Sequence, residues 1–133
     1  MSATIIDPPG LPPPRGYANG VLLGPGRMLF VAGQIAWDQD GQLVGGEDFA
    51  AQFAQALTNV RRVVEAAGGT VAQIGRLTIY VTDKGRYLAA RKDVGVAYRQ
   101  VMGRHFPAMS LVEVAALLEA GAQVEIEATA VVP

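Results

Sequence analysis

Apolar and polar side chains alternate strictly from residue 124 to residue 130. Valine, isoleucine and alanine occupy the even positions, and Glu125, Glu127 and Thr129 occupy the odd ones. Successive side chains of a β-strand point to opposite faces of a sheet. This run therefore predicts a strand with one apolar face and one acidic face.

A shorter run at residues 111–115 alternates in the same way. It places Glu113 on one face with Leu111 and Ala115, and the two valines at 112 and 114 on the other. If the intervening residues close a hairpin, the glutamates of both runs gather on a single face. Like charges that oppose one another across strands are destabilising. Such a face is either a solvated outer surface or a polar cleft between subunits, and the pattern leaves both interpretations open.

Two longer segments repeat apolar residues every three or four positions, which is typical of amphipathic helices. The first follows Asp48, which we expect to be its N-cap, and ends at the glycine pair 68–69. The second begins near Asp83 and ends at Gly103. Gly95 lies inside the second helix, and an interior glycine costs about 1 kcal/mol relative to alanine. We therefore expect Gly95 to mark a close packing contact.

Further strands are predicted at residues 17–23, 28–32 and 76–82, with a short one at 42–44. The run at 28–32 is continuously apolar, as expected for a strand that is buried on both faces. The complete order is β-β-(β)-α-β-α-β-β. It predicts an α+β sandwich, in which two helices cover one face of one mixed β-sheet.

The first 15 residues include five of the eight prolines. Proline fixes φ and lacks an N–H group, so residues 1–15 are expected to form a flexible arm, and residues 16–133 a single domain. A chain of 133 residues can build one core but not two. Half of the residues are hydrophobic and only 17% are charged. This apolar surplus favours an oligomer that buries surface between subunits.

The charge and the reactive residues exclude several classes of function. The net charge is −1 and the basic residues are scattered, which argues against nucleic-acid binding because phosphate contacts dominate that affinity. There is no cysteine and one histidine, so we expect no disulfide and no metal site. No apolar run approaches the roughly 18 residues of a membrane span, and no secretory signal is recognisable. We expect a cytoplasmic protein without a cofactor or membrane partner.

Several short motifs occur together in a recognisable order. Pro-Ala-Met-Ser at residues 107–110 is followed by Val-Glu-Val at 112–114 and by Val-Glu-Ile-Glu-Ala at 124–128. These motifs resemble the C-terminal signature of the RidA family, also called YjgF or endoribonuclease L-PSP. The resemblance extends upstream to about residue 15 through the segments at 31–35, 55–60, 65–68 and 79–83.

The resemblance implies a chorismate-mutase-like fold that assembles as a homotrimer, with small-molecule clefts between neighbouring subunits. Members typically hydrolyse reactive imines and enamines to a ketone and ammonia. Glu125 matches the residue that positions water, and Tyr17 matches a tyrosine at the edge of the cleft. Gly33 matches a backbone donor site, and Ala32 stands where many members have serine.

One departure from the family pattern concerns the substrate. Met109 occupies the position at which the family has an arginine that grips a carboxylate. Methionine fills space and contacts apolar groups but cannot pair with an anion. The cleft is therefore expected to be less cationic and more apolar than usual, unless Arg91 or Arg104 replaces the missing charge. Two functions remain open: a hydrolase for a non-standard imine or enamine metabolite, and a non-catalytic small-ligand binder or regulator.

Overall fold

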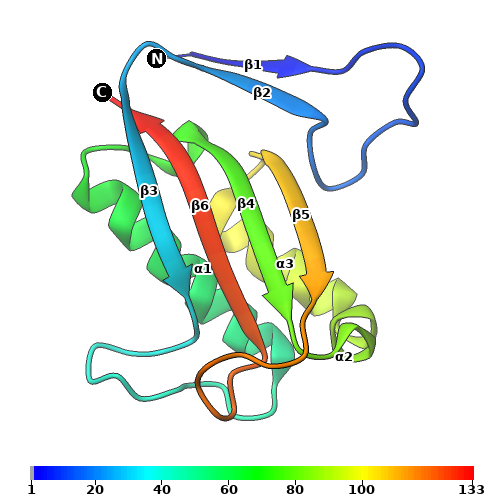
Figure 1. The fold of residues 1–133 in the computed structure, drawn as a ribbon, viewed down its shortest axis with the longest axis vertical. Helices are drawn as coiled ribbons and strands as arrows, with labels where there is room; N and C mark the ends of the chain where they lie inside the picture. The colour runs from blue at the N-terminus through cyan, green and yellow to red at the C-terminus, as the bar shows by residue number, and fades with distance from the viewer. Residues whose placement is uncertain (1) are drawn as a thin grey trace.

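The computed structural model describes residues 2–133, and its centre is a four-stranded mixed sheet with helices on one face (Figure 1). The strands are β3 (Arg27–Gln34), β4 (Ile74–Val81), β5 (Ala108–Glu113) and β6 (Val124–Val132), in the order β3-β6-β4-β5. β4 and β5 are parallel, whereas β6 is antiparallel to both of its neighbours. The predicted α+β architecture is confirmed.

The helices are α1 (Phe49–Ala66), α2 (Lys84–Ala89) and α3 (Arg91–Met102), and a short 3-10 turn, η1 (Val71–Gln73), precedes β4. The main-chain N–H of Ala51 donates a hydrogen bond of 3.1 Å to the carboxylate of Asp48. This confirms Asp48 as the N-cap, which satisfies one of the free N–H groups at the start of a helix. Phe53, Leu57 and Val60, which recur at the spacing predicted for this helix, are buried in the core.

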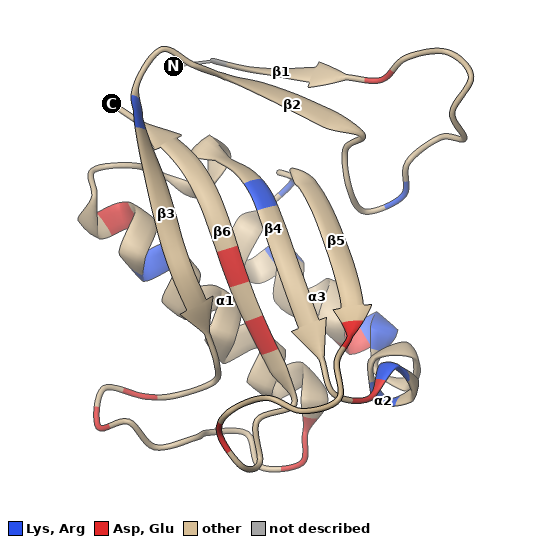
Figure 2. Cartoon of the chain, in the orientation of Figure 1, with Lys and Arg blue, Asp and Glu red and all other residues tan. Residues whose placement is uncertain are grey.

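β6 is an inner strand, and its alternation is confirmed. The even-numbered side chains of β6 are buried in the core, while the odd-numbered ones between them are half-buried. Ile126 is completely buried, and full burial of such a side chain stabilises a fold by about 1.5–3 kcal/mol. The opposite face of the sheet, which no helix covers (Figure 1), carries the odd-numbered side chains of β6, among them Glu125 and Glu127. Figure 2 marks the acidic positions along this strand.

The second predicted helix is in fact two helices. Ala90 adopts φ −96° and ψ 8°, which separates α2 from α3, although Asp83 caps the first piece and Gly103 (φ 64°) ends the second as predicted. The expectation for Gly95 is wrong. A Cβ at Gly95 would meet only the Nη1 of Arg99, at 3.6 Å, so this glycine faces open space rather than a close packing partner.

The expectations for residues 28–32 and for residues 42–44 are also wrong, and the hairpin considered for the two alternating runs does not form. The run at 28–32 is not buried on both faces, because β3 is an edge strand and its outer side chains Met28 and Phe30 are 63% and 74% exposed. The alternating runs do not close a hairpin, because β4 lies between β5 and β6. Glu113 therefore does not join the acidic face of β6, and its carboxylate instead accepts a hydrogen bond of 2.9 Å from the N–H of Lys84. Residues 42–44 form only an isolated bridge.

The N-terminal part contains a strand that the sequence analysis did not predict. β1 (Ser2–Ile6) pairs antiparallel with β2 (Gly20–Gly24), and the two form a ribbon apart from the main sheet (Figure 1). The proline-rich segment forms the connection between these strands. Beyond it, the N–H of Ala18 donates a hydrogen bond of 3.0 Å to the carbonyl of Pro107, which ties the chain to the start of β5. Within residues 2–133, no helix has the length and apolarity to cross a membrane.

Candidate functional site

Glu125 lies on the uncovered face of the sheet, beside a glycine of the neighbouring edge strand. A Cβ built on Gly33 would come within 2.8 Å of the Cδ of Glu125 and would overlap its Oε2. The missing side chain of Gly33 thus provides the space that this carboxylate occupies. Across residues 2–133 the structure contains a single ion pair, Arg61–Glu65 at 3.9 Å. The carboxylate of Glu125 is therefore not neutralised within the subunit and remains available to water or a ligand.

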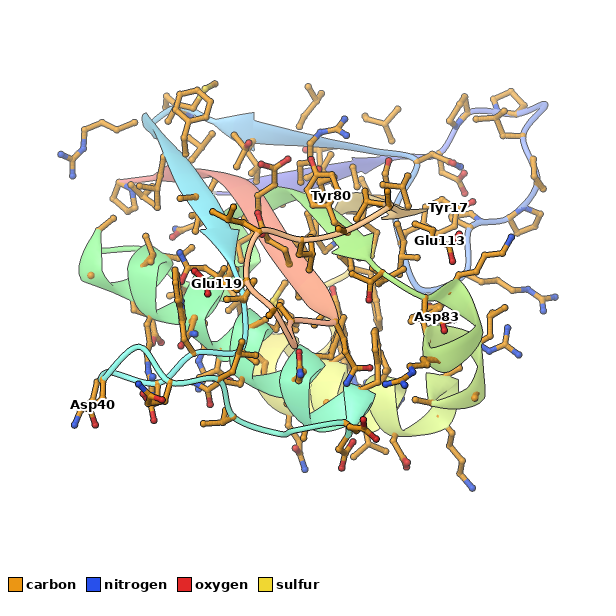
Figure 3. The ribbon with its side chains drawn as sticks, turned by 60° about the horizontal axis from the view of Figure 1, so that its bottom comes forward. Tyr17, Asp40, Tyr80, Asp83, Glu113 and Glu119 are labelled. Carbon is orange, nitrogen blue, oxygen red and sulfur yellow. The ribbon has the colours of Figure 1, made fainter. Side chains whose placement is uncertain are left out.

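Glu127, two residues further along the same face, has a partner. The phenol of Tyr80 on β4 donates a hydrogen bond of 2.6 Å to its carboxylate, and Figure 3 shows Tyr80 on the side of the sheet away from the helices. This hydrogen bond, followed by burial and by the negative charges of Glu127 and Glu125, raises the pKa of Tyr80 above its ordinary value. Glu127 is thus held by a structural contact, whereas Glu125 takes part in no ion pair within residues 2–133.

A cavity of about 700 Å³ lies on the other, helix-covered side of the sheet, at the open edge of β5. We call it the β5 pocket. It is bounded by β5, by α3 and by the segment that leads into β2. Its lining residues are Arg15, Gly16, Tyr17, Phe53, Ile79, Tyr87, Arg91, Val94, Gly95, Tyr98, Arg99, Phe106, Met109 and Leu111.

The floor of the β5 pocket is aromatic and firmly held. The ring of Tyr98 stacks on that of Phe106, with 5.2 Å between the centroids and 9° between the planes. Its hydroxyl donates a hydrogen bond of 2.6 Å to the carbonyl of His105, and burial raises the pKa of Tyr98 above its ordinary value. The Nε2 of His105 lies 2.7 Å from the carbonyl oxygen of Ile74. These contacts fix the loop between α3 and β5, and with it the position of Met109.

The predicted site residues fall into two groups on opposite faces of the sheet. Glu125 and Gly33 lie together on the uncovered face, where Ala32 is also exposed. Tyr17 and Met109 line the β5 pocket on the other side. The sheet separates the two groups within one subunit, so a single chain does not bring all five residues into one cleft.

The β5 pocket is cationic although Met109 stands at its β5 wall. Arg15, Arg91 and Arg99 all line it, and its described lining contains no Asp or Glu. The cleft expected from the resemblance lies between subunits, so its charge relative to other family members stays a prediction. Arg91 was one of two candidates for a replacement charge; Arg104, the other, is not among the lining residues. The sequence analysis missed Arg15 and Arg99. The spacing of residues 91, 95 and 99 could have revealed Arg99, because positions four apart share one face of a helix.

A second cavity, of about 630 Å³, lies near the start of α1, and the buried side chain of Gln52 is part of its lining. Gln52 is 1% exposed and holds three loop groups together. Its Nε2 donates to the carbonyls of Gly46 and Gly121 at 2.7 and 2.9 Å, and its Oε1 accepts from the N–H of Gln123 at 2.9 Å. Every polar atom of this amide is used within the fold, so Gln52 has a structural role here.

Comparisons with known proteins identify similar sequences and similar folds. A family profile described as Endoribonuclease L-PSP matches residues 11–132. A 2-iminobutanoate/2-iminopropanoate deaminase of Salmonella typhimurium is 40% identical over 118 residues, which are 86% of each chain. YyfB from Yersinia pestis, a protein of unknown function in the conserved Rid family, superposes with a TM-score of 0.87 at 37% identity, covering 99% of this chain and 100% of YyfB. TdcF from E. coli with bound serine gives a TM-score of 0.67 at 34% identity, covering 98% and 99%.

Proposed function

The chain belongs to the RidA family, also called the endoribonuclease L-PSP family, and on this premise we propose that it is a homotrimeric deaminase. Its substrate is an imine, an enamine or a related C–N bond in a small metabolite. The observation that carries the proposal is the unneutralised carboxylate of Glu125, held over Gly33 on the uncovered face. Relatives that align with 86% of the chain are named imine deaminases, which supports the reaction class.

The homotrimer is supported by the exposed apolar residues of the uncovered face. Met28, Phe30 and Val112 are exposed there, and an apolar face of this kind gains free energy when another subunit covers it. The two groups of site residues give a second reason. If the β5 edge of one subunit faces the uncovered face of the next, then Tyr17 and Met109 meet the neighbour's Glu125. The assembly thereby completes a cleft that a single chain leaves divided.

The proposed reaction needs one carboxylate and one water molecule. Glu125 accepts a proton from water as the oxygen attacks the carbon of the C=N bond, and passes this proton to nitrogen, giving a carbinolamine. The carboxylate then takes the proton of the carbinolamine hydroxyl and delivers it to nitrogen as the C–N bond breaks, so that a ketone and ammonia leave and the carboxylate is restored. A positioned general acid–base of this kind typically contributes about 100- to 10,000-fold to the rate.

The test compares two glutamates of one strand. 2-Iminopropanoate, generated by an amino acid oxidase acting on alanine, is offered to the wild type, Glu125→Gln and Glu127→Gln, and ammonia release is measured against buffer. We expect at least about a 100-fold loss in kcat/KM for Glu125→Gln and only a few-fold change for Glu127→Gln, with all three proteins sedimenting as trimers. A monomeric wild type, or equal rates in the two variants, refutes the proposal.

A second candidate function is a non-catalytic binder of small ligands, and Met109 is the observation that favours it. Methionine at position 109 cannot form the ion pair with a substrate carboxylate that the family's arginine is expected to form. The binder predicts that metabolites raise the melting temperature, by an amount that grows with the logarithm of ligand concentration over Kd. It also predicts that no imine is hydrolysed faster than in buffer. Turnover that depends on Glu125 excludes this alternative.

A further inference from the structure

The β5 pocket contains a stripe of positive charge that comes from a helix rather than from a strand. Arg91 and Arg99 lie on α3 with Gly95 between them, and all three line the pocket. Residues four apart stack on one helix face. Arg15 approaches the same pocket from the segment before β2. The single ion pair formed within residues 2–133 involves none of these arginines.

Gly95 shapes the space between the two helix arginines. The Nη1 of Arg99 lies 3.6 Å from the position of a Cβ on Gly95, so this guanidinium folds back along the helix, one turn towards Arg91. A helical side chain normally leans towards the N-terminus in this way. Arg91 and Arg99 thus line the pocket from one helix, and guanidinium groups donate charge-assisted hydrogen bonds to a carboxylate.

The remainder of the pocket is apolar and large. Met109 and Leu111 of β5, together with the stacked pair Tyr98–Phe106, form a surface without a charged group. The volume of about 700 Å³ falls within the roughly 300–1,000 Å³ of sites that hold drug-sized ligands. A three-carbon imino acid would leave most of this apolar surface in contact with water.

We propose that the preferred substrates are 2-imino acids with a large apolar or aromatic side chain, whose carboxylate binds Arg91 and Arg99 while the side chain packs on Met109 and the aromatic floor. This inference rests on the proposed function, because it places the reacting carbon next to the neighbour's Glu125. It assigns the anion-binding task to α3. Met109 becomes a contact for the side chain of the substrate, where the family pattern has an arginine.

The first experiment compares imines generated from phenylalanine, leucine, alanine and glutamate by amino acid oxidases. We expect kcat/KM for the phenylalanine- and leucine-derived imines to exceed that for the alanine-derived imine by at least about tenfold, since burial of a large apolar side chain is worth about that factor or more. An equal or reversed order, or a preference for the glutamate-derived dianion, overturns the assignment.

The second experiment tests the two arginines. Arg91→Met and Arg99→Met are each expected to raise KM about tenfold or more for the phenylalanine-derived imine with little change in kcat, and lysine at either position should restore part of the affinity. Arg104→Met removes the same charge from a residue outside the pocket lining and serves as the matched control. Unchanged KM in both pocket variants overturns the role of α3.

A binding measurement separates failure of this inference from failure of the proposed function. Phenylpyruvate and pyruvate are the keto acid products of the phenylalanine- and alanine-derived imines, and each can be titrated into the protein in the absence of ammonia. Tighter binding of phenylpyruvate that requires Arg91 and Arg99 supports the ligand class even if no imine is hydrolysed. Turnover of 2-iminopropanoate accompanied by equal binding of the two keto acids supports the reaction but refutes the ligand class.

Discussion

The substitution Gly33→Ala tests how the fold holds the carboxylate of Glu125. Gly33 is not in the left-handed region of φ, so alanine can adopt its backbone conformation and the effect is steric. The new Cβ would lie 2.8 Å from the Cδ and 3.0 Å from the Cγ of Glu125. Carbon atoms in van der Waals contact are about 3.5–4.0 Å apart. The side chain of Glu125 must therefore swing away.

The magnitudes separate activity from stability. Forcing Glu125 off its rotamer costs about 0.5–1.5 kcal/mol, while replacing glycine by alanine stabilises by about 0.4–1 kcal/mol through the unfolded chain. The free energy of unfolding should therefore change by less than about 1 kcal/mol. A displacement of about 1 Å in a catalytic group can reduce the rate about 100-fold. We expect a loss of that size in kcat/KM.

The assay is kcat/KM for imine hydrolysis in a double-mutant cycle of Gly33→Ala and Glu125→Gln, with urea unfolding of the same proteins. If Gly33 acts only through Glu125, the alanine has little further effect once Glu125 is replaced, because residues in contact are not additive. Full additivity of the two losses would refute this reasoning. So would wild-type activity in Gly33→Ala.

Two further predictions concern stability. Gln52→Ala removes three hydrogen bonds of a side chain that is 1% exposed. At about 0.5–1.5 kcal/mol for each bond, we expect the free energy of unfolding, measured in urea at fixed protein concentration, to fall by about 2–4 kcal/mol. The control Gln100→Ala, at an exposed helical position, should lower it by less than about 0.5 kcal/mol. The pKa of Tyr80 is raised in the folded protein, so its contact with Glu127 contributes fully to stability below the unfolded-state pKa of about 10. This contribution is lost as the pH rises through the higher folded-state pKa. Wild type should therefore lose more stability than Tyr80→Phe between about pH 9 and about pH 11.5, whereas parallel pH curves for the two proteins would contradict the assignment.

Local patterns in the sequence predicted the elements that depend on neighbouring residues. The stripe and caps of α1 and the alternation of β4 and β6 were all visible, because helix and strand periodicities reflect burial on one face. The break at Ala90 was not, since the residues on both sides continue one apolar stripe. The strand β1 was also missed: Ser2–Ile6 has no local partner, and its pairing with β2 bridges a proline-rich connection.

The candidate site also combines residues that the sequence identified with an arrangement that it did not predict. Motif order alone identified Glu125, Gly33, Tyr17 and Met109, but it could not show that they occupy opposite faces of the sheet. That separation follows from the strand register, in which Met109 pairs with the buried Leu77 of β4 and Glu125 pairs with Tyr80. This register is a non-local pairing that no nearby residues encode.

By itself, the sequence determined the family, the α+β class and the face on which each residue of β6 lies, because these properties follow from residue types at short spacing. Only the tertiary structure decided that Gly33 makes room for Glu125 and that the arginines of α3 line the same pocket as Met109. The physical reason is that such contacts join segments far apart in the chain. Their positions depend on how the whole sheet and its helices pack, and not on the preference of any one segment.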